Sequence, residues 1–155
     1  MTSAKATCEC KSVSFKVSTQ PLMRLICHCS ICQSFNNADY GDVLLYFEND
    51  VELPDEALLD YQAYRPPPNL QRGKCKKCAK PAVEYMSLLP LIPRVIVVPC
   101  AMVQERGILP RPSLQMFYEN HKVDYEPTIP KYSGYLPSQL AMIGYMSQGL
   151  LKKVV

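Results

Sequence analysis

The chain has 155 residues, 48% hydrophobic and 20% charged, so it can bury one core and suits a single domain. Seventeen lysines and arginines against 14 aspartates and glutamates give a net charge of +3, which excludes the concentrated basic surface of a nucleic-acid or membrane-binding protein. Fourteen prolines, six glycines and no tryptophan favour short elements joined by rigid connections, and hence a β-rich chain.

The N-terminal segment, Met-Thr-Ser-Ala-Lys-Ala-Thr-Cys, lacks the apolar core of a signal peptide. No stretch approaches the roughly 18 apolar residues of a membrane span. We therefore expect a cytoplasmic protein whose eight cysteines are reduced. Reduced cysteines at short spacings favour metal ligation, and a secreted disulfide fold is the alternative.

The hydrophobic pattern predicts seven short strands within a single domain over residues 1–155. The first is marked by Val13, Phe15 and Val17, which alternate with polar residues as in a half-buried strand. No repeat or long linker divides the chain, because Pro66-Pro67-Pro68-Asn69 is too short to separate domains. The predicted strands cover residues 11–17, 23–26, 42–47, 58–64, 82–86, 94–98 and 114–118.

A helix is predicted near the C-terminus, with Ser138 as its N-cap. Its apolar face is expected to consist of Leu140, Ile143, Met146 and Leu150. We expect this face to pack on the domain or on a partner subunit. A helix lying on a membrane surface is the alternative, since the segment is too short to span a bilayer.

Seven of the eight cysteines fall into three clusters, and Cys100 stands apart. The clusters are Cys8-Glu9-Cys10, Cys27-His28-Cys29-Ser30-Ile31-Cys32 and Cys75-Lys76-Lys77-Cys78. Two pairs of thiolates complete the tetrahedral site that structural zinc favours. This grouping predicts metal binding.

The first and third clusters are predicted to share one structural zinc ion. Cys75 and Cys78 have the spacing of a zinc knuckle, and Gly73 before them can take the positive φ that such a turn can require. Cys8 and Cys10, as alternate residues of an extended chain, would present both thiolates on one face. The ion would tie the first strand to the middle of the domain.

The middle cluster offers three thiolates, Cys27, Cys29 and Cys32, and no obvious fourth cysteine. An open coordination position is typical of a catalytic zinc. Ligation by His28 is disfavoured, because alternation along an extended segment points it to the opposite face. A closed site completed by Cys100 and a set of buried thiols are the alternatives, although Cys100 follows an apolar run and is expected in the core.

The order Cys-x-Cys, Cys-His-Cys-Ser-x-Cys, Arg-Gly-x-Cys-x-x-Cys resembles the glutathione-dependent formaldehyde-activating enzyme family, which includes centromere protein V. The likeness covers residues 7–132, including Tyr64-Arg65, and residues 133–155 form a C-terminal extension. The resemblance implies a mainly β fold, the β-tent of packed antiparallel sheets, with the short C-terminal helix added here. It also implies two zinc ions per chain: a structural one on Cys8, Cys10, Cys75 and Cys78, and another on Cys27, Cys29 and Cys32. The second ion is expected to be the more labile, because fewer thiolates hold it and one ligand is exchangeable.

The resemblance further implies a zinc-dependent carbon–sulfur lyase similar to S-(hydroxymethyl)glutathione synthase, acting on a thiol/aldehyde adduct. The expected partner is a small-molecule thiol such as glutathione, with no nucleic acid and no membrane, and a dimer is one of the oligomeric states left open. The alternative is a non-enzymatic zinc module, either a glutathione carrier or a protein-binding scaffold. A methionine sulfoxide reductase fits poorly, since those enzymes hold zinc through two Cys-x-x-Cys pairs.

Two loops depart from the family pattern. Residues 33–38 contain no glycine, although Asn36 and Asn37 can adopt left-handed backbone angles, and Ala79 replaces the glycine common after the knuckle. Both loops are therefore expected to differ in shape, and with them the glutathione pocket. Three arginines are candidates for binding the carboxylates of such a ligand: Arg24, Arg65 and Arg72.

Overall fold

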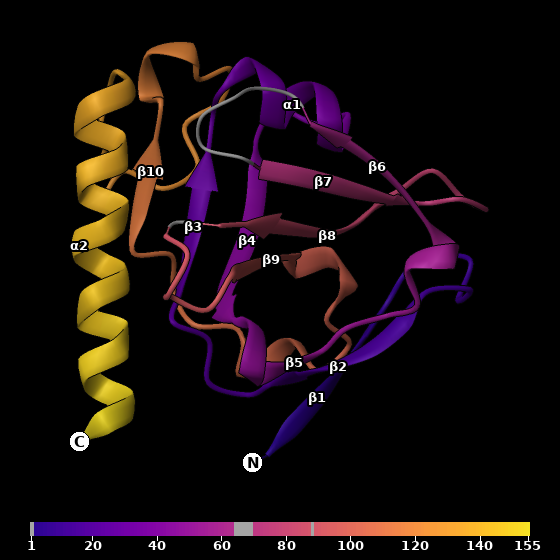
Figure 1. Ribbon diagram of the computed structural model, residues 1–155. Coiled ribbons are helices and arrows are strands. Elements are labelled where there is room, and N and C mark those ends of the chain that lie inside the picture. The colour runs from indigo at the N-terminus through magenta and orange to yellow at the C-terminus, as the bar shows by residue number, and fades with distance from the viewer. Residues whose placement is uncertain (1, 64–69, 88) are drawn as a thin grey trace. The chain divides into compact units, whose positions relative to one another are not determined.

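The computed structural model describes residues 2–63, 70–87 and 89–155 (Figure 1). This part of the chain is mainly β, and its strands form two sheets, which confirms the predicted fold class. Two compact units are present, one made of Met1–Pro21 and Leu45–Leu109, the other of Leu22–Leu44 and Pro110–Val155. That residues 1–155 act as a single domain stays a prediction.

The first unit contains an antiparallel three-stranded sheet in the order β1-β2-β5. Its strands are β1 (Ser3–Thr7), β2 (Ser14–Ser18) and β5 (Val51–Glu52). Phe15 and Val17 are buried on one face of β2, as their alternation predicts. The strand begins later than expected, because Lys11 has a φ of 66° and belongs to a turn.

Four further strands of the first unit follow one another in the antiparallel order β9-β8-β7-β6. They are β6 (Leu59–Ala63), β7 (Leu70–Cys75), β8 (Pro81–Met86) and β9 (Val95–Pro99). Strand β7 was not predicted, because its sequence is polar. Its buried Arg72 lies opposite buried Glu84 of β8, and the two side chains form an ion pair at 3.1 Å. Tyr64, the last residue of the predicted strand, and the Pro66–Asn69 segment lie outside the described residues.

The second unit places β10, β3 and β4 in that order. Its elements are β3 (Met23–Cys27), α1 (Ser30–Asn36), β4 (Gly41–Phe47), β10 (Leu114–Met116) and α2 (Tyr135–Val154), with Leu45–Phe47 of β4 belonging to the first unit. Strand β10 runs parallel to β3, so the expectation of purely antiparallel sheets is wrong here. It ends early, because Phe117 has a φ of 52°.

Helix α1 was not predicted from the sequence. Phe35 is its buried residue, and Asn37 ends it in the left-handed conformation with a φ of 47°, as expected of that asparagine. Short 3-10 helices complete the described elements: η1 (Glu48–Asp50), η2 (Glu56–Leu58), η3 (Cys100–Met102), η4 (Arg106–Ile108) and η5 (Tyr118–Asn120).

Helix α2, drawn in yellow in Figure 1, packs along β10 and β3. Its N-cap is Gly134, so the predicted cap at Ser138 is wrong. The Ser138 hydroxyl is instead buried, accepting the Phe117 N–H at 3.0 Å and donating to the Tyr132 carbonyl at 3.3 Å. Gly149 permits close packing, because a Cβ there would collide with the Leu22 carbonyl.

Of the apolar face predicted for this helix, only Met146 packs on the domain, and packing of its other three residues on a partner subunit stays a prediction. Met142 and Met146 are buried beside Ser138, whereas Leu140, Ile143 and Leu150 are exposed. The helical spacing of the apolar residues predicts that the leucines face inward. The two hydrogen bonds of Ser138 instead turn the face that carries Ser138 inward. Over the described part of the chain, no helix has the length and apolar character needed to cross a membrane.

Candidate metal centres

The four cysteines predicted to share an ion come together in the first unit. The sulfur atoms of Cys8, Cys10, Cys75 and Cys78 all lie within 4.8 Å of one another. Three of the separations are 3.4 Å for Cys8–Cys10, 3.8 Å for Cys8–Cys75 and 3.6 Å for Cys10–Cys75. A tetrahedral zinc with Zn–S bonds of about 2.3 Å sets its sulfurs about 3.8 Å apart. The donor set therefore fits a four-thiolate zinc site.

The first arm of this site is a turn rather than an extended strand. The Cys8 N–H donates to the Val13 carbonyl at 3.0 Å, and the Lys11 N–H donates to the Cys8 carbonyl at 2.9 Å. Lys11 adopts a φ of 66° to close the turn. Cys8 and Cys10 thus converge because the chain folds back between β1 and β2, and the expected strand alternation is the wrong reason.

The second arm is a tight turn after β7. The Ala79 N–H donates to the Cys75 carbonyl at 2.9 Å, and Ala79 holds the left-handed angle with a φ of 59°. The prediction that Gly73 supplies the positive φ is therefore wrong. A Cβ on Gly73 would lie 2.8 Å from the Tyr61 ring and 2.9 Å from the Val83 carbonyl oxygen, so this glycine serves close packing between strands.

A serine that sequence reasoning missed lies beside these sulfurs. The Ser12 hydroxyl is 3.0 Å from Cys10 Sγ and 3.1 Å from Cys75 Sγ. Its hydrogen bonds lower the pKa of Cys10 to about 6, whereas burial raises the pKa of Cys78 to about 11. The cluster thus holds one thiolate near neutral pH without a metal. The Cys-x-Cys-x-Ser spacing is the signal that could have revealed this residue.

The middle cluster forms in the second unit where β3 passes into α1. Cys27 ends β3, Cys29 is the N-cap of α1 and Cys32 lies in its first turn. Their three sulfurs lie within 4.8 Å of one another, and Cys27 Sγ is 3.4 Å from Cys29 Sγ. An N-cap side chain and the third helical residue face the same side, so the helix brings Cys29 and Cys32 together.

The proton of Cys27 is held tightly in the absence of a cation. Hydrogen bonds with Cys29 and Cys32, together with burial, raise the pKa of Cys27 well above its usual value. Three ionised sulfurs this close would repel one another, and a divalent cation that binds thiolates relieves that repulsion. Cys27 is buried, and Cys29 and Cys32 are half-buried.

His28 lies between two of these cysteines but belongs to a different environment. It is fully buried, and its Nε2 is 2.8 Å from Gln115 Oε1. The Gln115 amide nitrogen donates to the Glu126 carbonyl at 3.1 Å, so Gln115 Oε1 accepts from His28 Nε2–H. His28 packs edge-on against Tyr118, with ring centroids 5.4 Å apart. It does not join the three sulfurs.

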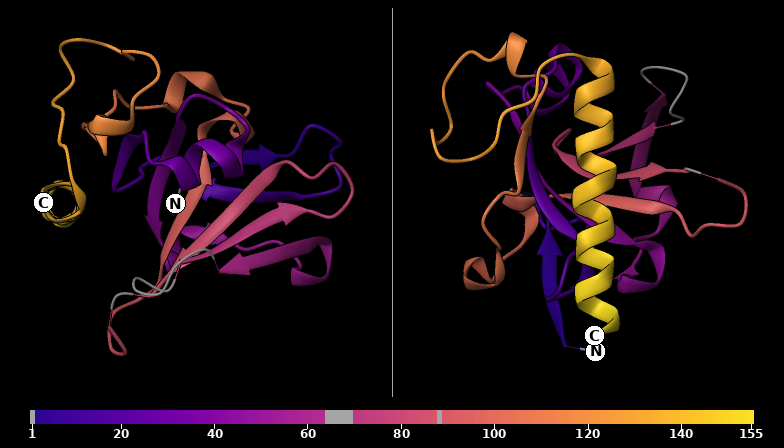
Figure 2. Two further views of the ribbon diagram at one scale, coloured as in Figure 1. Left: turned by 90° about the horizontal axis from the view of Figure 1, so that it is seen from above. Right: turned by 90° about the vertical axis from the view of Figure 1, so that its left-hand side faces the viewer.

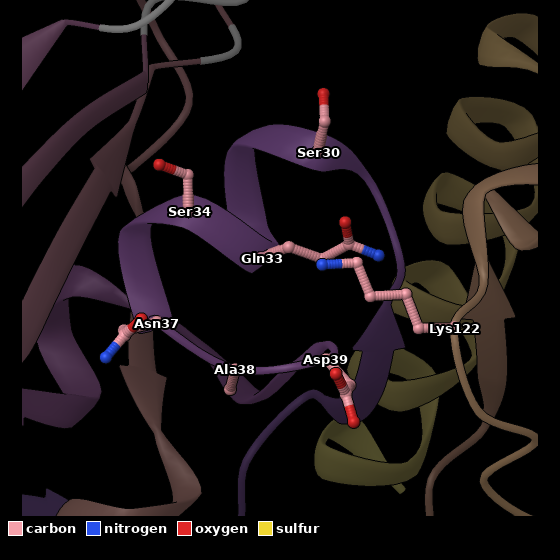
Figure 3. Close-up of a pocket in the computed structure, with 7 residues that line it drawn as sticks. All are labelled: Ser30, Gln33, Ser34, Asn37, Ala38, Asp39 and Lys122. Carbon is pink, nitrogen blue, oxygen red and sulfur yellow. The ribbon is translucent and has the colours of Figure 1, made fainter.

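A polar pocket of about 380 Å³ opens along α1 (Figure 3). The Gln33 and Lys122 side chains both line this pocket. Several lining residues come from the segment in which the sequence departs from the family pattern. The pocket is lined by Ser30, Gln33, Ser34, Asn37, Ala38, Asp39 and Lys122.

The candidate anion-binding arginines are engaged by carboxylates of the chain itself. Arg24 forms two hydrogen bonds with Asp42, at 2.8 and 2.7 Å, and Arg72 pairs with Glu84. Arg65 lies outside the described residues. Cys100 is buried in η3 of the first unit, the core position expected of it.

The fold and the sulfur clusters define a mainly β protein with two thiol-rich candidate metal centres. The family model of the glutathione-dependent formaldehyde-activating enzyme matches residues 3–120, and the chain belongs to this family. A crystal structure of a Rhodobacter sphaeroides protein is similar at 17% identity and a TM-score of 0.51, over 70% of this chain and 97% of that chain. At this identity the likeness supports the fold alone. A comparison with curated proteins finds no match.

Proposed function

We propose that this chain is a zinc-dependent carbon–sulfur lyase that acts on the adduct of a small-molecule thiol, such as glutathione, and an aldehyde such as formaldehyde. The observation that carries the proposal is the three-sulfur cluster of Cys27, Cys29 and Cys32 in a member of this family. Three sulfur ligands leave one position of a tetrahedral ion for an exogenous group. The four-sulfur cluster leaves none, which suits a structural zinc.

Zinc held by the three sulfurs would supply Lewis acidity and stabilise a thiolate at neutral pH. Hydrogen bonds within the chain position the sulfur atoms that would bind this zinc. The Cys29 sulfur is oriented by the Cys32 N–H, which donates to it at 3.3 Å. The hydrogen bond between His28 and Gln115 holds the segment that carries Cys27 and Cys29. Half-buried Cys29 and Cys32 leave the cluster accessible to a small thiol.

The pocket along α1 supports recognition of a zwitterionic thiol. Glutathione carries two carboxylates and one ammonium, and the pocket offers the Lys122 ammonium and the Asp39 carboxylate as complementary charges. The Gln33 amide donates to the Asn120 carbonyl at 2.9 Å, which holds this side chain at the pocket wall. We therefore propose that the loop of residues 33–38, which differs from the family pattern, helps to select the thiol substrate.

The test measures exchange between glutathione, formaldehyde and their adduct by magnetic resonance, with and without protein. Wild type is expected to accelerate exchange, and Cys29→Ser is expected to abolish the acceleration while keeping the N-cap, because serine caps helices well. Cys100→Ser is the matched control, since this cysteine lies in η3 rather than in a sulfur cluster. Binding of glutathione without faster exchange would replace the lyase by a carrier.

A further inference from the structure

Helix α2 carries a second apolar face that turns away from its own unit. Figure 2 shows the helix as one unbroken element. Ser138, Met142 and Met146 form the buried side. The exposed stripe repeats at alternating intervals of four and three residues: Leu136, Leu140, Ile143, Ser147, Leu150 and Val154.

The exposure of this stripe is large for apolar side chains on a single helix. Leu136 is 63% exposed, Leu140 60%, Ile143 46%, Leu150 40% and Val154 76%. No charged residue occurs from Tyr135 to Leu151, so no salt bridge or hydrated head group interrupts the face. An apolar surface of this extent marks an interaction site rather than ordinary scatter.

The spacing of the residues in this stripe indicates that the partner that packs against it is another helix. Apolar residues every 3.5 positions on average form the seam along which two helices pack. Small residues let the backbones approach: Ser147 lies on the stripe, and a Cβ on Gly144 beside it would meet nothing within 4 Å. A helix resting on a membrane surface carries lysines and arginines along its polar face, whereas α2 has only Lys152 and Lys153, in its last turn.

The same stripe is complementary to itself when a second copy runs antiparallel. A two-fold axis beside residue 145 brings Leu136 against Val154 of the partner subunit. It brings Leu140 against the partner subunit's Leu150, and Ile143 against the partner subunit's Ser147, a large residue against a small one. Every position of the stripe thus meets another, as an isologous interface requires. We propose that α2 is the interface of an antiparallel homodimer of this chain.

The charges at the two ends of α2 favour the antiparallel direction. Lys152 and Lys153 lie in the last turn, and Glu119 lies at the start, where its carboxylate accepts the Gly134 N–H at 2.8 Å. Antiparallel packing brings the lysines of each chain toward Glu119 of the partner subunit, whereas parallel packing would place four ammonium groups together.

The expected dimer is of modest affinity. Twenty residues make a helix of about 30 Å, and one helix pair belongs to the class of interfaces that bury under about 1,200 Å². A micromolar dissociation constant is therefore expected. Because α2 lies beyond the family match at residues 3–120, the interface is a property of this chain's extension and is independent of the proposed lyase activity.

Sedimentation velocity over a concentration series tests the proposal. Wild type is expected to shift from monomer to dimer, and Leu140→Lys is expected to raise the dissociation constant at least tenfold. Its circular dichroism spectrum and its melting temperature, compared at concentrations where both proteins are monomeric, should equal those of wild type. Gln148→Lys is the matched control, because this exposed residue lies about 120° around the helix from the stripe. A monomer up to 200 micromolar, or a dimer that Leu140→Lys does not weaken, overturns the proposal.

The direction is tested by mixing two variants that are each monomeric. Leu140→Lys with Leu150→Glu should restore a heterodimer, since antiparallel packing sets these positions opposite each other. Leu140→Lys with Leu140→Glu should not; association of that second mixture alone means parallel packing and overturns the proposal. Wild type that stays monomeric yet sediments with phosphatidylserine vesicles also overturns it, in favour of a membrane-surface helix.

Discussion

The Cys29 sulfur accepts a hydrogen bond from the backbone N–H of Cys32 at 3.3 Å. One side chain therefore both caps α1 and belongs to the three-sulfur cluster. Folding of the first turn of α1 and assembly of the cluster are consequently coupled, because each restricts the same side chain.

This coupling predicts different outcomes for two substitutions of Cys29. Cys29→Ser should lose one bound zinc yet stay folded, because the serine oxygen still caps α1. Cys29→Ala should lose the same metal and a further ~1 kcal/mol of stability with the cap. Metal analysis and chemical denaturation of apo and metal-loaded protein measure both quantities. Equal stability of the two apo variants would show that the cap contributes nothing.

Cys75→Ser should behave as a folding variant. The substitution removes a buried ligand of the four-sulfur cluster, and metal binding at a structural site contributes directly to the free energy of folding. The protein is expected to become insoluble or to melt at a much lower temperature. Zinc content and melting temperature equal to those of wild type would contradict a structural role; Cys100→Ser serves again as the control.

The two sites should lose metal at different pH. The pKa of Cys27 is raised by its neighbouring thiols, so an incoming ion must displace its proton, and affinity there falls as the pH falls. Cys78, whose pKa burial raises to about 11, makes the same demand at the four-sulfur site, but that site holds its ion through four sulfurs rather than three. Chelator competition between pH 8 and 6 should therefore empty the three-sulfur site first. Release of both ions in one step would refute this order.

Ala79→Gly should stabilise the protein. Alanine at a φ of 59° is strained by roughly 1 kcal/mol, and glycine removes that strain while adding some entropy to the unfolded chain. We expect a net gain of about 0.5 kcal/mol, or a rise of one to two degrees in melting temperature. Ala82→Gly, in buried strand β8, should instead lower it.

Removing one partner of the buried ion pair in the first unit should lower the stability more than replacing both partners with apolar residues. Arg72→Met leaves the Glu84 carboxylate buried without its guanidinium and is expected to cost about 3 to 5 kcal/mol. Arg72→Met combined with Glu84→Met removes both charges and should recover most of that loss. Urea denaturation of the wild type, the two single variants and the double variant measures this coupling.

Most strands and both cysteine groupings could be predicted from the sequence, for local physical reasons. Alternation of apolar residues marks a strand with one buried face and placed β2, whereas short apolar runs bounded by turn residues placed β4, β8 and β9, each to within a few residues. Metal ligands recur at short spacings because one ion must be reached by neighbours along the chain. Cys8 and Cys10 were therefore paired with Cys75 and Cys78 even though the expected backbone shape around them was wrong.

The tertiary structure alone decided features whose signals are not local. Strand β7 is polar in sequence and is held inside by the charge of Glu84 on a different strand. The inward face of α2 depends on two hydrogen bonds of Ser138, and Ala79 adopts its angle because the backbone must turn between Cys78 and β8. The residue types determined which side chains could bind a metal ion. The pairing of buried polar groups decided which surfaces turn inward, because such groups need hydrogen-bond or ion-pair partners that sequence spacing does not reveal.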